Sequence, residues 1–384
     1  MKISQAIIFF GTVFLVYGSI NYYIIRRIVS VVPDTYKTLA IIILAVTASS
    51  FVLGRILENY WYSYLVDFLI WIGSIWIAIM FYTFLCLVIV DLLRLINHFI
   101  PFIPKVFAEH PLKARNLVAV IIFVLVTSTV VGGIINSRMI AVKKYNLHLD
   151  KNGGNLKSLR IVMASDLHLG NIYGHYFMYD FVKTINSLKP DVVLLAGDIV
   201  DEDIAPLVRE NLGEKFDSIK SKYGIYAVTG NHEFIGGVEP AIEYLTKHGI
   251  KFLRDTSVFV DNSFYLTGRE DRDITRFTSK KRKPLDEILS GADKSFPIIM
   301  MDHQPFNLEQ AEQNGIDLQL SGHTHNGQLW PLNHIVDKVY ELAWGYKRKS
   351  DTHYYVSCGV GGWGPPVRTG SRPEIIKINL HFKE

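Results

Sequence analysis

Hydrophobic residues are concentrated in the first part of the chain, where they form four long runs with few or no charges. A helix of about 20 predominantly apolar residues crosses a bilayer, and each run is close to that length. The runs cover residues 3–25, 39–53, 65–90 and 117–135. No short cleavage region follows the first run, so we interpret it as a retained helix and not as a signal peptide. The pattern therefore predicts about four transmembrane helices within residues 1–138.

The hydrophobic pattern changes after residue 138. Residues 139–157 form a polar junction that ends in a turn cluster, but apolar and polar residues alternate between Met139 and Leu149, which is typical of an edge strand. From residue 158 to 384, short apolar runs typical of strands alternate with segments predicted as helices, such as residues 176–188 and 207–223. This alternation predicts a layered α/β domain.

Five predicted strands run directly into aspartate, histidine or asparagine residues. They cover residues 159–165, 191–196, 224–229, 297–301 and 316–320, and the polar residues that follow them are Asp166, His168, Asp198, Asp201, Asn231, His232, His303, His323 and His325. Open α/β sheets bind ligands in the crevice outside the carboxyl ends of their strands, so we expect these side chains to converge at one edge. Asp198 is the centre of this arrangement, because it follows five consecutive apolar residues and Gly197.

The spacing and chemistry of these residues favour a metal site. In an extended segment, Asp-x-His and His-x-His place two side chains on the same face. Carboxylate and amide oxygens together with imidazole nitrogens suit Zn, Mn or Fe, and the set contains no thiolate. Seven candidate ligands are more than one ion holds, so two divalent ions that share a bridging carboxylate are the simplest arrangement.

The motifs in this order resemble the five-block signature of the calcineurin-like metallophosphoesterase superfamily, over roughly residues 159–380. The resemblance implies a calcineurin-like α/β sandwich over residues 158–384. It also implies two metal ions with these ligands: Asp166, His168 and His325 for the first, Asn231, His303 and His323 for the second, and Asp198 as the bridge. His232 would contact the phosphate and protonate the leaving oxygen, since an imidazole titrates in the range that general acid catalysis needs.

Two further residues are candidates for supporting roles. In the family that the chain resembles, a residue at the position of Asp201 supports the site from behind the ligands, whereas a helix or turn cap is the alternative reading. Residues 359–368 and 373–376 are similar to the C-terminal part of a membrane-anchored bacterial subgroup that includes enzymes of the UDP-2,3-diacylglucosamine pyrophosphatase type. Arg368 in this segment is a candidate to bind phosphate or to support the site.

The net charge and the distribution of Lys and Arg bear on the binding partners of the protein and on its orientation in a membrane. The net charge is only +4 and no base-stacking module is visible, which argues against nucleic acid as a partner. Seven Lys and Arg residues fall between the first and second and between the third and fourth apolar runs, against five on the other side of the membrane. The positive-inside rule then predicts that the C-terminal domain lies outside the cytoplasm. The resemblance to a membrane-anchored bacterial subgroup implies an integral protein of a bacterial inner membrane.

Together these features predict a membrane-anchored two-metal phosphoesterase that acts on a phosphate ester or pyrophosphate. We expect a small phosphorylated substrate, and a lipid-linked one such as UDP-2,3-diacylglucosamine of lipid A synthesis would share the membrane with the enzyme. An extracytoplasmic domain conflicts with that compound, because a nucleotide-activated lipid is expected at the cytoplasmic face. A general extracytoplasmic phosphodiesterase or phosphomonoesterase, and a membrane sensor or scaffold with a structural metal site, are the alternatives. The sequence identifies no protein partner.

Overall fold

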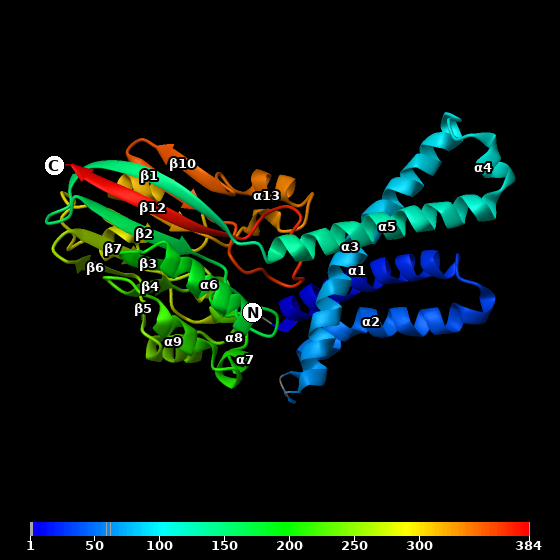
Figure 1. The fold of residues 1–384 in the computed structure, drawn as a ribbon, viewed down its shortest axis with the longest axis horizontal. Helices are drawn as coiled ribbons and strands as arrows, with labels where there is room; N and C mark the ends of the chain where they lie inside the picture. The colour runs from blue at the N-terminus through cyan, green and yellow to red at the C-terminus, as the bar shows by residue number, and fades with distance from the viewer. Residues whose placement is uncertain (1–2, 59, 62, 384) are drawn as a thin grey trace. The chain divides into compact units, whose positions relative to one another are not determined.

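The computed structural model describes residues 3–58, 60–61 and 63–383. The chain divides into two units, each with its own internal packing (Figure 1). One unit is Met1–Ile135 with Gly364–Val367, and the other is Asn136–Trp363 with Arg368–Glu384.

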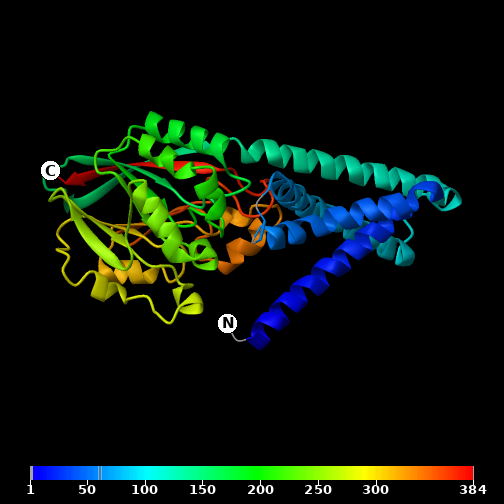
Figure 2. The same ribbon diagram turned by 90° about the horizontal axis from the view of Figure 1, so that it is seen from below.

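The first unit is helical, and each predicted apolar run lies within one long helix (Figure 2). Its elements are α1 (Ile3–Val29), η1 (Asp34–Tyr36), α2 (Lys37–Leu57), α3 (Tyr64–Phe99), α4 (Lys105–Glu109) and α5 (Pro111–Ser137). Prolines mark several of the breaks between helices, since proline removes a backbone donor and restricts the residue before it.

Among the residues that the structure describes, three helical segments are long and apolar enough to cross a membrane. They cover Asp34–Leu57, Tyr64–Phe99 and Pro111–Ser137. The sequence predicts about four spans, so three of them are supported. The predicted span over residues 3–25 falls in α1, which is not among the three, and the side chains of residues 3–7, 9 and 10 lie outside the described ones.

Polar side chains and one close backbone contact hold α1, α2 and α3 together. Tyr17 donates from its hydroxyl to the carbonyl of Ala48 at 2.6 Å, and the indole N–H of Trp76 donates to Asn21 Oδ1 at 2.9 Å. A Cβ atom at Gly73 would collide with the backbone of Phe51, so α2 and α3 approach more closely there than any other residue allows. Small residues and interhelical hydrogen bonds of this kind are what helices use to associate in membranes.

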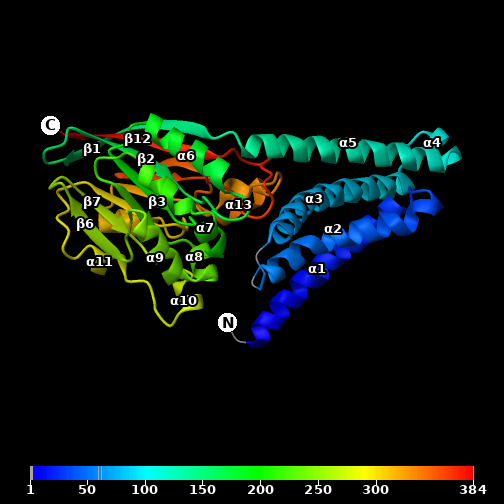
Figure 3. The same cartoon turned by 60° about the horizontal axis from the view of Figure 1, so that its bottom comes forward.

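The second unit contains two six-stranded sheets (Figure 3). In spatial order, the first consists of β1 (Ala141–Asn152), β12 (Glu374–Lys383), β2 (Ser158–Ala164), β3 (Val192–Ala196), β4 (Ile225–Val228) and β5 (Ile250–Phe252). The second consists of β10 (Gly345–Lys349), β11 (Thr352–Val356), β9 (Leu318–Ser321), β8 (Ile298–Met301), β7 (Phe264–Gly268) and β6 (Thr256–Val260). The edge strand predicted within the junction corresponds to β1, which pairs in parallel with β12 at the edge of the first sheet.

The five strands that carry the candidate ligands belong to both sheets. Strands β2, β3 and β4 are parallel neighbours in the first sheet, and β8 and β9 are parallel neighbours in the second. The expectation of a single sheet edge is therefore wrong. The two sheets pack face to face because both have apolar inner faces, and the core between them includes Ile161, Met163 and Leu194 of the first sheet with Ile299 and Leu320 of the second.

Helices cover the outer faces of both sheets. Apolar residues of α6 (His175–Ser187), α7 (Ala205–Arg209), η2 (Leu212–Ser218) and α9 (Val238–Lys247) share a core with the first sheet. Residues of α11 (Leu285–Ile288) and α12 (Glu309–Asn314) share another with the second. The remaining short helices are α8 (Asn231–Gly236), α10 (Ile274–Phe277), η3 (His325–Gly327) and α13 (Asn333–Val339).

One predicted helix differs from the structure. The sequence predicts a continuous helix over residues 207–223, but this region forms only α7 and the 3-10 helix η2. Asn211 lies between them in the left-handed conformation, with φ of 46°, which a helix cannot accommodate. Asparagine tolerates that conformation better than most residues, so it ends the helix here.

Candidate metal centre

Each candidate ligand lies just beyond the carboxyl end of a strand. Asp166 and His168 follow β2, and Asp198 follows β3. Asn231 is the first residue of α8 after β4, and the three remaining ligands follow β8 and β9, namely His303, His323 and His325. The structure brings these residues together from both sheets, as the following distances show.

One group consists of Asp166, His168 and His325. Each offers a ligand atom within 4.8 Å of those of the other two. Nε2 of His168 lies 3.2 Å from Nε2 of His325, which in turn lies 3.5 Å from Asp166 Oδ1. Asp166 and His168 are buried.

A second group consists of Asp198, His303 and His323, whose ligand atoms also lie within 4.8 Å of one another. Nε2 of His303 is 3.1 Å from Asp198 Oδ2, and Asn231 Oδ1 is 2.8 Å from His323 Nδ1. Asp198 Oδ2 also lies 3.9 Å from His168 Nε2. Asp198 is therefore placed between the two groups.

The contacts of His303 fit a bound cation. Its Nδ1 lies 2.7 Å from the carbonyl oxygen of Ala196 and therefore carries the proton of the neutral ring. When the ring is neutral, the lone pair of Nε2 faces the Asp198 carboxylate. Two electron-rich atoms 3.1 Å apart need a proton or a cation between them. The mixed oxygen and nitrogen donors are those that Zn, Mn and Fe accept.

The backbone of the site is held in an uncommon conformation. Five ligand residues have positive φ, namely Asp166, His168, Asp198, His323 and His325. Such residues cost on the order of 1–3 kcal/mol each and persist only where the surrounding structure determines them, which occurs mostly at functional sites. Gly197 has φ of 87°, and a Cβ atom there would lie 2.6 Å from His303 Nδ1, so glycine is required.

His232 and Asp201 lie beside the two groups. The backbone N–H of His232 donates to Asp198 Oδ1 at 2.9 Å, and its ring stands perpendicular to that of His168 with centroids 4.5 Å apart. Asp201 Oδ1 is 3.6 Å from Nδ1 of both imidazoles. A single carboxylate thus faces the rear nitrogen of a candidate ligand and of the candidate general acid.

A cavity of about 290 Å³ opens onto these residues. Its lining residues are Asp198, Glu202, Asn231, His232, Ile235, His323, His325 and Trp363. Most of them are polar, but Ile235 and Trp363 are 44% and 52% exposed and form an apolar part of the wall. The cavity can therefore accommodate a ligand that carries an anionic group next to an apolar one.

Comparison with known proteins identifies the family. The family model for calcineurin-like phosphoesterases matches residues 159–327, the part of the chain that carries both ligand groups. An uncharacterized metallophosphoesterase of Aquifex aeolicus is 30% identical over 244 residues, which cover 63% of this chain and 92% of the relative. The chain belongs to the calcineurin-like metallophosphoesterase superfamily.

Two further relatives are longer than the part they share with this chain. An uncharacterized metallophosphoesterase of Helicobacter pylori is 32% identical over 245 residues, covering 62% of this chain and 63% of the relative. A Danio rerio protein named "Transmembrane protein with metallophosphoesterase domain" is 31% identical over 287 residues, covering 71% and 65%. This metallophosphoesterase thus spans less than two thirds of the length of either relative.

Arg368 lies behind His325 and is fully buried. Its Nη2 lies 3.2 Å from His325 Nδ1 and donates to the carbonyls of Cys358 and Gly361 at 2.9 and 2.5 Å. Its Nη1 donates to the hydroxyl of Ser371 at 3.2 Å. Arg368 is not among the described residues that line the cavity. This placement favours support of the site over direct contact with phosphate.

Glu233 is a supporting residue to which the sequence reasoning assigned no role. Its buried carboxylate accepts hydrogen bonds of 2.7–3.1 Å from four backbone N–H groups in the loops after β3 and β4. The four donors are Asp198, Ile199, Val200 and Gly230. Burial and the nearby Asp198 raise the pKa of Glu233 to about 7, against the lowering effect of these donors. The sequence signal for this role is its position as the third residue of α8, where a glutamate reaches back to the start of the helix.

Replacing Glu233 with Gln is expected to destabilise this unit by about 2–3 kcal/mol, because the amide nitrogen cannot accept two of the four N–H groups. The melting temperature measured on the purified protein should fall by several degrees. Glu243→Gln is the matched control, because Glu243 is exposed on α9 and bonds only to Lys247 in the described structure. Equal melting temperatures for the two variants would show that Glu233 does not organise these loops.

Burial and nearby charges shift the pKa values of the candidate histidine ligands in opposite directions. Burial, reinforced by the charge of His303, lowers the pKa of His323 to about 3. Burial, His168 and the Arg368 guanidinium lower the pKa of His325 as well. Burial opposes protonation of His303, but the Asp198 carboxylate outweighs it and raises the pKa of His303 well above its ordinary value. These shifts favour the neutral form of His323 and His325 and the protonated form of His303.

Metal binding is therefore expected to release at least one proton near pH 7. His303 must lose its proton to coordinate a cation, and burial raises the pKa of Asp166 too. Because the folded pKa of His303 is raised, metal affinity should increase by about tenfold per pH unit for each proton released, up to that pKa. Calorimetric titration with Mn²⁺ or Zn²⁺ in two buffers of different protonation enthalpy measures the number of protons. Equal apparent enthalpies in both buffers would contradict the prediction.

Proposed function

We propose that this chain is a membrane-anchored, metal-dependent hydrolase of phosphate esters or pyrophosphates. The observation that carries the proposal is the placement of Asp198 between two groups of metal-ligand side chains, next to a cavity. Membership of the superfamily and three helices long and apolar enough to cross a membrane support it.

The proposed ligand sets follow the two groups. Asp166, His168 and His325 would hold one divalent ion, Asn231, His303 and His323 the second, and Asp198 would bridge them. Such ions supply Lewis-acid chemistry that activates water and neutralises charge on phosphate. Mn, Fe and Zn all accept these ligands. The chain itself holds the ligand side chains in place, through the left-handed backbone at several ligand residues and through the hydrogen bonds of Glu233 to the loops after β3 and β4.

His232 is the proposed proton donor to the leaving oxygen. It lines the cavity beside Asp198, and Asp201 faces its Nδ1 at 3.6 Å, where the negative charge opposes the lowering of its pKa by burial. We assign Asp201 and Arg368 as positioning residues, because both face a ring nitrogen of a candidate ligand from behind.

The proposed substrate carries an apolar or aromatic group next to its phosphate. Ile235 and Trp363 supply an apolar wall beside polar residues of the cavity. A lipid-linked compound such as UDP-2,3-diacylglucosamine fits this wall and a membrane-anchored enzyme. In a bacterial inner membrane, the distribution of Lys and Arg supports a catalytic unit outside the cytoplasm, which conflicts with that compound because a nucleotide-activated lipid is expected at the cytoplasmic face. Accessibility of residue-specific labels in intact cells tests the orientation.

The test is metal-dependent hydrolysis by the detergent-solubilised full-length chain. Bis(p-nitrophenyl) phosphate, p-nitrophenyl phosphate and UDP-2,3-diacylglucosamine should be offered with Mn²⁺, Zn²⁺ or Fe²⁺. We expect turnover that a chelator abolishes and added metal restores. Bound metal without turnover of any compound would contradict a hydrolase of this scope and favour a sensor or scaffold with a structural site.

A further inference from the structure

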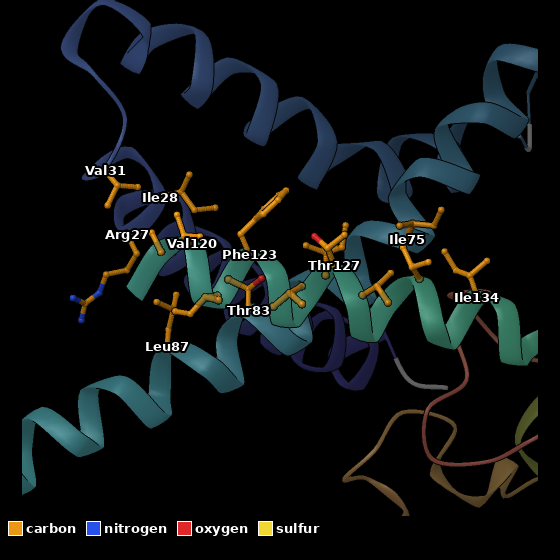
Figure 4. Close-up of a pocket in the computed structure, with 16 residues that line it drawn as sticks. Arg27, Ile28, Val31, Ile75, Thr83, Leu87, Val120, Phe123, Thr127 and Ile134 are labelled. Carbon is orange, nitrogen blue, oxygen red and sulfur yellow. The ribbon is translucent and has the colours of Figure 1, made fainter. Parts of the chain in front are cut away.

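A groove runs between three helices of the first unit. It has a volume of about 570 Å³ and is drawn in Figure 4. Its lining residues come from the last part of α1 and the following turn, from the middle of α3 and from α5, where they extend from Ala119 to Ile134. At 1.5 Å per residue, this length of α5 is about 22 Å, which exceeds the roughly 15 Å of one leaflet's hydrocarbon layer.

The groove is apolar along its length and charged at one end. Arg27 is the one charged side chain among the described lining residues, and the polar ones besides it are Thr83 and Thr127. Figure 4 shows Arg27 and Leu87 at one end and Ile75 and Ile134 at the other. An apolar channel with a single cation at its end complements an amphiphile whose polar head is anionic.

The charges around Arg27 leave a net positive end. Arg27 Nη2 lies 2.5 Å from Asp91 Oδ2, which also accepts from the Tyr23 hydroxyl at 2.6 Å. Arg94 Nη1 lies 3.6 Å from the other oxygen of the same carboxylate. Two guanidinium groups thus share one carboxylate. The side chain of Arg27 is 35% exposed, so it is fixed in place and still accessible to a ligand.

An open apolar groove of this kind must be filled in a bilayer. Val126 and Val130 are buried at its wall, whereas Phe123 is 70% exposed. Water cannot satisfy its hydrogen bonds against such a surface, and empty space loses dispersion contacts. An acyl chain is the filler that the bilayer supplies.

The geometry points to a binding site for one anionic phospholipid, with an acyl chain between α3 and α5 and the headgroup phosphate at Arg27. The inference rests on the membrane-spanning part of the proposed function and is independent of hydrolysis.

The test is photolabelling of the full-length chain in phosphatidylcholine vesicles that contain a minor fraction of phosphatidylglycerol with a diazirine in its acyl chain. Labelled peptides should concentrate at groove positions of α3 and α5, and unlabelled phosphatidylglycerol should compete better than phosphatidylcholine. Arg27→Gln should reduce this preference about fivefold, because one basic residue near the surface typically strengthens binding to anionic lipid by about that factor. Arg26→Gln is the matched control, because Arg26 is exposed, adjacent and absent from the groove lining.

A second pair of variants tests the acyl-chain half of the site. Thr127→Phe should fill the groove and lower its labelling severalfold, whereas Ser128→Phe, at an exposed neighbour outside the lining, should not. Equal labelling of groove positions and of the exposed Val124 and Leu125, or equal competition by both lipids, would overturn the inference. Asp198→Asn should label like wild type, so loss of hydrolysis and loss of lipid binding are separable. Absence of label from every helix would instead overturn the membrane-spanning proposal together with this inference.

Discussion

Replacing Asp198 with Asn is expected to lower metal-dependent phosphoester hydrolysis on the order of 10³-fold, since a bound metal contributes several kcal/mol and about 1.4 kcal/mol corresponds to tenfold. Asparagine keeps the shape of the side chain and can still accept the backbone N–H of His232. It removes the negative charge that both ligand groups share. The metal content per chain should fall as well, because neither group retains its common carboxylate.

The measurements are the initial rate with bis(p-nitrophenyl) phosphate and the metal content of the purified protein. Asp191→Asn is the matched control, because Asp191 precedes the other end of β3 and pairs with Arg160 at 2.8 Å. Full metal content with only a small loss of rate in the Asp198 variant would rule out the bridging position proposed for this residue.

Replacing His232 with Ala is expected to slow the hydrolysis of substrates with a poor leaving group much more than that of substrates with a good one. A general acid contributes typically about 10²–10⁴-fold, so hydrolysis of an alkyl phosphodiester should fall by that factor. Hydrolysis of bis(p-nitrophenyl) phosphate should fall far less, because nitrophenolate departs without a proton. Metal content should stay unchanged.

The pH dependence provides a second measure of the same role. Burial lowers the pKa of His232, so its protonated form increases as pH falls toward that value. In the wild type, the ratio of alkyl to aryl hydrolysis should therefore rise as pH falls, and in the variant it should stay flat. Taking a ratio removes the effect of pH on metal occupancy, which both substrates share.

His334→Ala is the control for these measurements, because His334 is an exposed residue of α13. His232 also lies within 4.8 Å of His168 and Asp198 in a group that could itself hold a metal. Equal losses with both leaving groups, together with reduced metal content, would identify His232 as a ligand and not as the proton donor.

The sequence by itself determined most of the local structure. The four apolar runs lie in four long helices, and the five ligand-bearing strands form, because run length and side-chain alternation are properties of neighbouring residues. The residue types at the strand ends were sufficient to nominate the ligands, since the donor chemistry of Asp198 or His303 does not depend on the rest of the chain. A local pattern was less reliable at Asn211, where one left-handed residue divides the predicted helix.

Only the tertiary structure decided how these parts meet. A strand's pattern shows which residues it buries but not which partner it packs against, so the division of β2, β3 and β4 from β8 and β9 was not visible in the sequence. The contacts of His303 with Ala196 and of Arg368 with His325 join residues far apart in the chain. Glu233 is the clearest case, because the four backbone N–H groups that donate to its carboxylate come together only when the loops after β3 and β4 lie side by side. Such contacts arise from the packing of whole sheets, which no short stretch of sequence encodes.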